Sequence, residues 1–150
     1  SDADKDLVII SNVEKNKFYM DLQAKTNFEA DARIKFVGTV YNAELLKYIR
    51  ENAFAYLHGH EVGGTNPSLL EALAATQLNL LLDVGFNKEV GKDGALYWKK
   101  DNLARIINKV EKLKMDEIET FSQLSSKRIE DAFSWHKIVT DYEKVFNGGV

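Results

Sequence analysis

The stretch from His58 to Ala75 constrains the fold more than any other part of the chain. An apolar and aromatic run, residues 53–57, precedes it and is typical of a buried strand. Gly63 and Gly64 then relax the backbone, and the residues that follow Pro67 are rich in strong helix formers. The stretch therefore predicts a strand, a glycine loop and a helix in direct succession.

Asn66 and Pro67 predict where this helix begins. Asn is a favoured N-cap because its side-chain oxygen can accept a free N–H of the first turn. Proline suits the first helical position, since its missing N–H would have no partner there. Pro67 is the only proline in the 150 residues, which makes its position informative.

A glycine loop that leads into a helix N-terminus can bind an anion. Free amides point outward, the helix dipole favours negative charge, and absent side chains let a phosphate approach the backbone. One exposed contact of this kind contributes only about 0.3–1 kcal/mol, so tight binding needs several amides and hydroxyls such as those of Thr65 and Ser68. Glu71, one turn into the helix, is placed to address a sugar hydroxyl beside the phosphates. A plain strand-to-helix turn explains the same residues without a ligand.

Composition limits the classes of function. The net charge of −3, with no basic stripe interleaved with aromatic residues, argues against nucleic-acid binding. The absence of cysteine excludes disulfides and thiolate chemistry. No run approaches the roughly 18 apolar residues that span a bilayer, and no secretory signal is recognised. We expect one globular domain over residues 1–150, located in the cytoplasm.

Strands and helices alternate along the chain. This order predicts an α/β fold, a Rossmann-like and mostly parallel sheet flanked by helices. We expect residues 85–94 to form a loop with one helical turn near Lys88. The predicted strands are residues 7–10 (buried), 33–40, 53–57, 78–84 and 95–98. The predicted helices are residues 17–26, one capped by Asn42, residues 68–75, residues 102–113 capped by Asp101, and residues 116–146.

Several side chains are expected in the core or at the surface. Trp98 and Trp135 are expected to anchor the core, and Lys99 and Lys100 to be solvated. Inward-facing apolar residues are expected on two of the helices: Phe18, Met20 and Leu22 on the first, and Leu103, Ile106, Ile107 and Val110 on the helix at 102–113.

Ligands of parallel sheets bind beyond the carboxyl ends of the strands. The loops at residues 11–17, 38–42 and 58–66 are therefore the candidates. His58 and His60 would share one side if the strand continued, but with only His136 besides, a zinc site lacks ligands. We therefore expect no metal at this pair.

The loop and helix resemble the donor-binding half of the retaining GT-B glycosyltransferases of family 4. Leu70, Glu71 and Ala72 match the end of that family's pattern of two glutamates separated by seven intervening residues, whereas Gly63 stands where the first glutamate is expected and Glu61 two positions earlier. Residues 62–72 are more similar still to streptococcal-type polysaccharide rhamnosyltransferases, in which this departure at Gly63 is the rule. Residues 7–12, 33–40 and 133–142 extend the resemblance to nearly the whole chain.

The resemblance implies a role for each candidate residue. Glu71 would hydrogen-bond the ribose hydroxyls of the donor nucleotide, and the backbone of Gly38, Thr39 and Val40 would contact the nucleobase. His60 and Glu61 are the catalytic candidates at the donor sugar. The residues that would hold the diphosphate or the sugar are Gly63, Gly64, Thr65, Asn66 and Ser68. The substrate would be a dTDP-sugar, with no metal or other cofactor.

The resemblance also implies an activity, the transfer of rhamnose from dTDP-rhamnose to a polysaccharide or lipid-linked saccharide acceptor. The family's first strand of this domain, with its basic pair, has no match before Leu7, and neither has the acceptor-binding N-terminal domain. We therefore expect a fragment, lacking its first βα unit, of a longer enzyme that could be peripheral at the inner membrane face. Alone it would bind nucleotide weakly and not turn over. Rearrangement, or pairing with a second copy, could fill the gap in its sheet.

Two other hypotheses stay open. One is a non-catalytic α/β module that binds a nucleotide or docks a partner; a receiver-like version needs acidic residues clustered at a strand end, and none lies near residues 7–11. The other is a GT-B-shaped nucleotide-sugar epimerase. It needs acid–base residues at a domain cleft, for which His58 and His60 are weak candidates.

Overall fold

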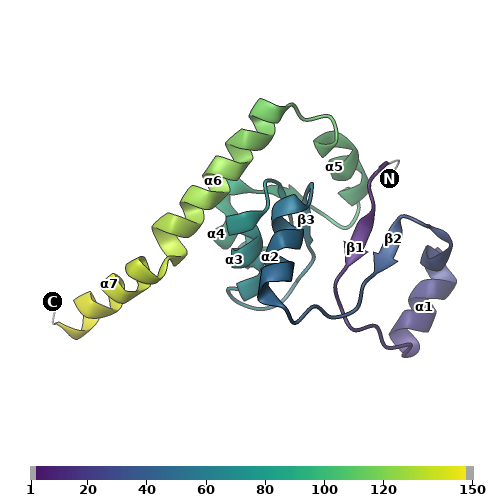
Figure 1. Ribbon diagram of the computed structural model, residues 1–150, viewed down its shortest axis with the longest axis horizontal. Coiled ribbons are helices and arrows are strands. Elements are labelled where there is room, and N and C mark those ends of the chain that lie inside the picture. The colour runs from purple at the N-terminus through teal and green to yellow at the C-terminus, as the bar shows by residue number, and fades with distance from the viewer. Residues whose placement is uncertain (1–2, 148–150) are drawn as a thin grey trace. The chain divides into compact units, whose positions relative to one another are not determined.

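The computed structural model describes residues 3–147, and its backbone divides into two compact units. The division falls between Leu46 and Lys47, inside helix α2 (Ala43–Asn52). Each unit has its own parallel sheet, two-stranded in the first and three-stranded in the second (Figure 1). The α/β class and the parallel pairing are therefore confirmed, in two small sheets.

The N-terminal unit pairs β1 (Leu7–Ile9) with β2 (Ile34–Phe36) in parallel. The connection contains α1 (Lys17–Thr26) and the short 3₁₀ helix η1 (Phe28–Ala30). Two asparagines set the limits of α1: the side chain of Asn16 accepts a hydrogen bond from the Tyr19 amide at 3.0 Å, and Asn27 ends the helix with a left-handed φ of 49°. The predicted helix at residues 17–26 is confirmed.

Phe28 is the one buried residue among those described in the N-terminal unit. The ring of Tyr19 meets it edge-on with centroids 5.3 Å apart, and the ring of Phe36 lies 5.6 Å away. A two-stranded sheet with one connecting helix offers little surface on which to bury side chains.

Two predictions for this unit are wrong for that reason. Phe18, Met20 and Leu22 do not face a core, since they are 74%, 57% and 39% exposed. The first strand is not buried either, because Leu7 and Val8 are both exposed.

The second unit is built on a parallel sheet in the order β3-β4-β5. The strands are β3 (Tyr56–His58), β4 (Asn79–Leu82) and β5 (Leu96–Trp98), each within a predicted stretch or one residue beyond it. Helix α3 (Pro67–Ala75) connects β3 to β4, and α4 (Gly85–Gly91) with the 3₁₀ helix η2 (Lys92–Gly94) connects β4 to β5. The predicted helical turn near Lys88 is confirmed but is longer than expected, and the loop predicted for the rest of residues 85–94 is wrong, because α4 and η2 cover them. Glycines at both ends of α4 weaken its helical signal in the sequence.

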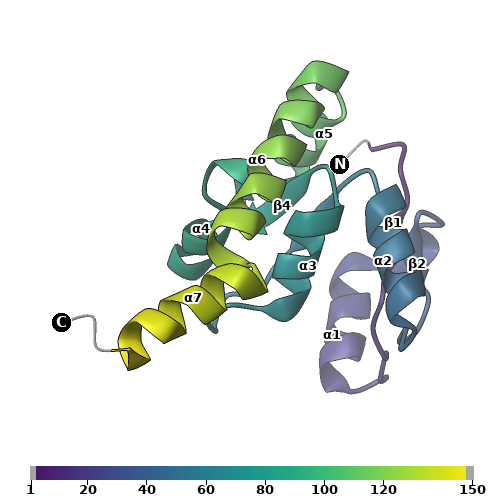
Figure 2. The same ribbon diagram turned by 60° about the vertical axis from the view of Figure 1, so that its left-hand side comes forward.

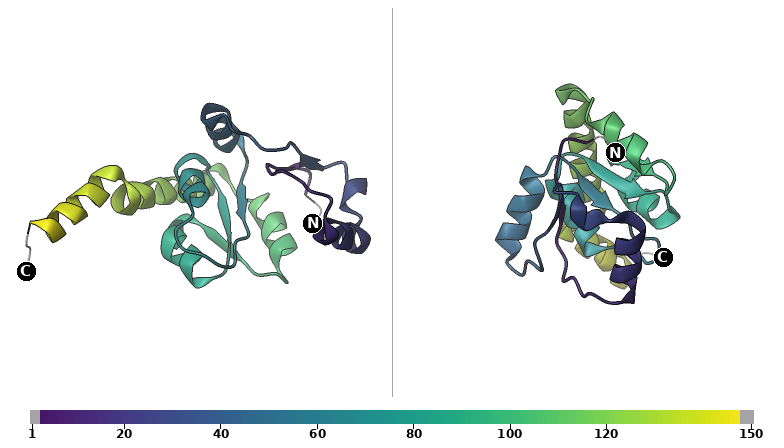
Figure 3. Two further views of the ribbon diagram at one scale, coloured as in Figure 1. Left: turned by 90° about the horizontal axis from the view of Figure 1, so that it is seen from below. Right: turned by 90° about the vertical axis from the view of Figure 1, so that its right-hand side faces the viewer.

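Helices cover both faces of the three-stranded sheet (Figure 3). Along β4, Leu80 and Leu82 pack in one apolar cluster and Leu81 in another, as the alternation of a strand requires. Helices α5 (Leu103–Val110) and α6 (Met115–Phe133) complete the two layers. The cluster around Leu80 includes Trp98, Leu103, Ile106, Ile107, Val110 and Ile118, and that around Leu81 includes Leu69, Leu73, Val90, Ile129 and Phe133.

The apolar face predicted for α5 and the buried position of Trp98 are thereby confirmed. Three other predictions for this part of the chain are wrong. Asn102 and not Asp101 precedes α5, and its side chain accepts a hydrogen bond from the Lys99 amide at 2.7 Å. Ser134 divides the long C-terminal helix by capping a separate helix, α7 (Trp135–Phe146). Trp135 anchors no core, because it is 81% exposed.

Each sheet has an edge without a partner strand in the described part of the chain. β1 pairs with β2 alone, and β3 pairs with β4 alone. None of the helices within residues 3–147 combines the length and the apolar character needed to span a membrane.

Helix α6 packs closely against Gly94. It lies against η2 and α3 (Figure 2), and the hydroxyl of Ser125 donates a hydrogen bond of 2.7 Å to the carbonyl of Leu73 in α3. A Cβ atom on Gly94 would stand 2.6 Å from the Cα atom of Ser125. Glycine at this position therefore sets how close α6 can pack.

We expect Gly94→Ala to destabilise the protein, because the added methyl group meets the backbone of α6. Overpacking of this kind costs about 1–3 kcal/mol, measured as the free energy of unfolding in urea. Gly85→Ala is the matched control, since no atom lies within 4 Å of its added Cβ atom. Equal stability of the two variants would show that α6 docks less closely than described.

Candidate functional site

The predicted start of the helix after β3 is confirmed. Pro67 is the first residue of α3, and the side-chain oxygen of Asn66 accepts hydrogen bonds from the amides of Ser68 at 2.9 Å and Leu69 at 3.4 Å. Leu69 and Leu73, on the inner face of α3, are fully buried. The cap and the core thus fix the end of the loop that precedes α3.

The loop itself is open to solvent. Residues 59–65 are exposed, and Gly63 has a φ of 137°, a conformation that residues with a side chain rarely adopt. Added Cβ atoms at Gly63 and Gly64 would meet no atom within 4 Å. The amides of Gly63, Gly64 and Thr65 have no hydrogen-bond partner within residues 3–147. These loop amides are therefore free to bind a ligand, whereas the cap already occupies the Ser68 amide.

His58 and His60 do share one side of the chain, as their spacing allowed. Their rings stack with centroids 4.6 Å apart. His58 ends β3 and is 1% exposed, and its Nδ1 lies 3.2 Å from the Tyr56 hydroxyl, while His60 is exposed. Within residues 3–147, no group of three or more side chains could hold a metal ion.

The environment of β3 disfavours charge on both of its polar rings. Burial, with a smaller contribution from His60, lowers the pKa of His58 from 6.5 to about 4. Burial also raises the pKa of the Tyr56 phenol. At neutral pH both rings, at the end of β3 that leads into the loop, are therefore uncharged.

Glu71 forms an ion pair that no local pattern in the sequence predicts. Its Oε2 lies 2.6 Å from Nη1 of Arg50, near the end of α2. The Arg50 side chain is only 11% exposed, whereas that of Glu71 is 56% exposed. The carboxylate is thus held from one side and reachable by a ligand from the other.

Two further contacts hold the start of the loop. Glu61 pairs with Lys100, which follows β5, so Lys100 is exposed but not merely solvated. The side-chain amide of Asn87 in α4 donates to the carbonyl of His60 at 3.2 Å. Neither Asn87 nor Arg50 was among the predicted site residues. Applying the carboxyl-edge rule to β4 as well as to β3 would have pointed to Asn87.

Gly38, Thr39 and Val40 follow β2 in the N-terminal unit. Gly38 has a φ of 76° and is exposed, as is Thr39, whereas Val40 is half-buried. Their proposed contact with a nucleobase stays a prediction.

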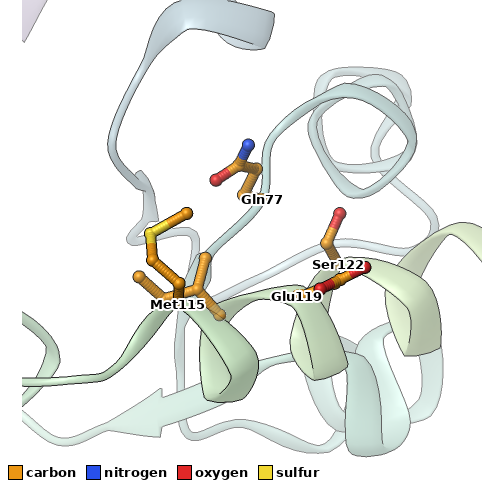
Figure 4. A pocket seen from close by; sticks show the side chains of 5 residues that line it. Gln77, Met115, Glu119 and Ser122 are labelled. Atoms are coloured by element: carbon orange, nitrogen blue, oxygen red, sulfur yellow. The ribbon is translucent and has the colours of Figure 1, made fainter.

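An open hollow lies elsewhere on the second unit (Figure 4). It is lined by Gln77, Met115, Ile118, Glu119 and Ser122. Gln77 precedes β4, so the hollow lies near the amino end of that strand, whereas the glycine loop leaves the carboxyl end of β3. Ligands of parallel sheets favour the carboxyl ends, so the loop is the stronger candidate.

No protein-family model matches the chain, and no curated protein matches it.

We expect His58 to make stability depend on pH. In the unfolded chain its pKa returns to 6.5, so the unfolded state binds a proton that the folded state resists. The contribution of the neutral His58 to the free energy of unfolding is therefore fully present above pH 6.5 and is lost as the pH falls toward 4. Between about pH 7.5 and pH 5 the loss amounts to about 2 kcal/mol.

Urea unfolding at those two pH values tests this expectation. In His58→Phe, the difference in unfolding free energy between the two pH values should be smaller than in the parent by about 2 kcal/mol. His136→Gln replaces an exposed histidine and serves as the control. A His58→Phe variant with the pH dependence of the parent would show that His58 titrates normally.

Proposed function

We propose that the chain is the donor-binding part of a retaining, GT-B type glycosyltransferase similar to family 4. The proposed substrate is a nucleoside diphosphate sugar, of which dTDP-rhamnose is the first candidate, and the proposed acceptor is a polysaccharide precursor. The observation that carries the proposal is the open glycine loop between β3 and α3, with three free amides beside a helix start.

The loop supports a specific way of holding the diphosphate. The amides of Gly63, Gly64 and Thr65 would donate to its oxygens, together with the hydroxyls of Thr65 and Ser68. Asn66 keeps the Ser68 amide for the helix, so its own contribution is to fix the loop. Amides held in place before the reaction stabilise a leaving diphosphate without reorganisation, which is the electrostatic form of catalysis.

Glu71 is suited to the ribose. A carboxylate has about four lone-pair sites, and the Glu71 side chain, whose Oε2 lies 2.6 Å from Nη1 of Arg50, is 56% exposed. Its remaining lone-pair sites would accept hydrogen bonds from two adjacent hydroxyl groups. His60 and Glu61 lie at the start of the same loop and are proposed to contact the donor sugar.

The division into two sheets also supports the resemblance. A GT-B donor domain without its first strand would have a gap at the centre of its sheet. The chain has one sheet of two strands and one of three, each with an open edge among the described strands. We therefore propose donor binding without turnover for this chain alone, since the basic pair and the acceptor domain of the family have no match in it.

We expect dTDP to raise the melting temperature of the chain, because a ligand that binds the folded state stabilises it by mass action. A panel of dTDP, UDP, GDP and their sugars, measured by thermal shift, identifies the base. Glu71→Gln should weaken the affinity for the preferred nucleotide about tenfold, the effect of losing hydrogen bonds to a charged acceptor.

Two controls make the result specific. Glu130→Gln changes an exposed helical glutamate on α6 and should leave the shift unchanged. Arg50→Met removes the partner of Glu71 but keeps the carboxylate, so it separates loss of the ion pair from loss of the ribose contact. No stabilisation by any nucleotide of the panel, or rapid sugar transfer by the chain alone, would contradict the proposal. A non-catalytic nucleotide-binding module would show the shift without a preference for any sugar.

A further inference from the structure

Asn87 joins the carboxyl ends of β3 and β4. It lies in the first turn of α4, and its side chain is fully buried. The side-chain nitrogen donates to the carbonyl of Leu82 at 2.9 Å and to that of His60 at 3.2 Å. Leu82 is the last residue of β4, and His60 is the second residue after β3. One side chain therefore connects the rigid sheet to the start of the glycine loop.

The burial of Asn87 shows what these two bonds contribute. Its Oδ1 is buried without a hydrogen-bond partner among the described residues, and an unsatisfied buried acceptor costs about 1–3 kcal/mol. An apolar side chain of the same size would avoid that cost. What asparagine contributes that an apolar side chain could not is therefore the pair of donated hydrogen bonds, one of them to the loop residue His60.

The glycine loop is consequently fixed at both ends. At its start, Asn87 holds the carbonyl of His60, whose ring also stacks on the buried His58. At its end, Asn66 caps α3. Ordering the backbone of a residue costs about 1–2 kcal/mol, so a loop with fixed ends loses less conformational freedom when it binds a ligand.

We propose that Asn87 is a positioning residue for the donor diphosphate. It holds His60 in place, and with it the free amides of Gly63, Gly64 and Thr65. The identity of the ligand rests on the proposed function, whereas the effect of Asn87 on the loop does not.

Asn79, the first residue of β4, provides a matched control. It is 1% exposed, its side-chain nitrogen donates to the carbonyl of Thr76 at 3.0 Å, and its Oδ1 also lacks a partner within residues 3–147. It differs from Asn87 in lying at the amino end of β4, where it has no contact with the glycine loop. Asn87→Leu and Asn79→Leu therefore remove similar buried donors in different places.

The decisive measurement is the set of NMR order parameters of the backbone amides at residues 61–65. Both variants should lose stability in urea, but only Asn87→Leu should lower the loop order parameters, from about 0.85 toward 0.6. Affinity for dTDP should fall about tenfold in Asn87→Leu and stay within about twofold in Asn79→Leu. Equal order parameters in the two variants would overturn the proposal.

The experiment separates this proposal from the proposed function. If the parent chain binds none of dTDP, UDP and GDP, the proposed function fails, and the loop order parameters still decide the role of Asn87. If Asn87→Leu does not fold, the parent supplies the test through the side-chain amide protons of Asn87. These protons should exchange slowly with solvent, and rapid exchange would overturn the proposal.

Discussion

The second unit depends on the burial of β4 from both sides. Every residue of this strand is buried, and successive side chains enter opposite clusters, one against α5 and the start of α6, the other against α3 and α4. β3 and β5 each form their ladder with β4. A strand enclosed in this way is held rigidly. Its neighbour β3 is paired with it, and the glycine loop begins at the end of β3. The position of the loop is therefore a consequence of how the core packs.

The chemical character of the loop follows from its two ends and from what lies between. Hydrogen bonds from Asn87 and to Asn66 fix the ends, while Gly63 and Gly64 leave amides uncovered between them. The buried His58 at the end of β3 is neutral, so it adds no positive charge beside the loop. The nearest cation that pairs with the loop, Lys100, is engaged by Glu61, so oriented amides, which act at short range, are the main source of attraction for an anion. This favours a ligand that makes several close contacts, as a diphosphate does.

Local signals in the sequence predicted the structural features that depend on residues close together in the chain. The cap at Asn66 and Pro67, the buried run of β4 and the apolar face of α5 are of this kind. Periodicity shows which side of a helix is apolar, but not whether a partner covers that side, so Phe18 and Trp135 were misplaced. The contacts of Asn87 with His60 and of Arg50 with Glu71 join residues far apart in the chain. The carboxyl-edge rule could have placed Asn87 at this edge of the sheet, but no pattern in a single sequence reports which group it contacts.

The pair of Arg50 and Glu71 resolves an apparent conflict in the proposed site. A glutamate beside a diphosphate would repel it if the carboxylate were unpaired, because both carry negative charge. Arg50, mostly buried and 2.6 Å away, offsets that charge from the side of the protein. The exposed part of the carboxylate can then act as a hydrogen-bond acceptor for neutral hydroxyl groups with less electrostatic cost to the phosphates. The ion pair would thus allow the proposed ribose contact on α3 and the proposed diphosphate contact at the adjacent loop to lie next to each other.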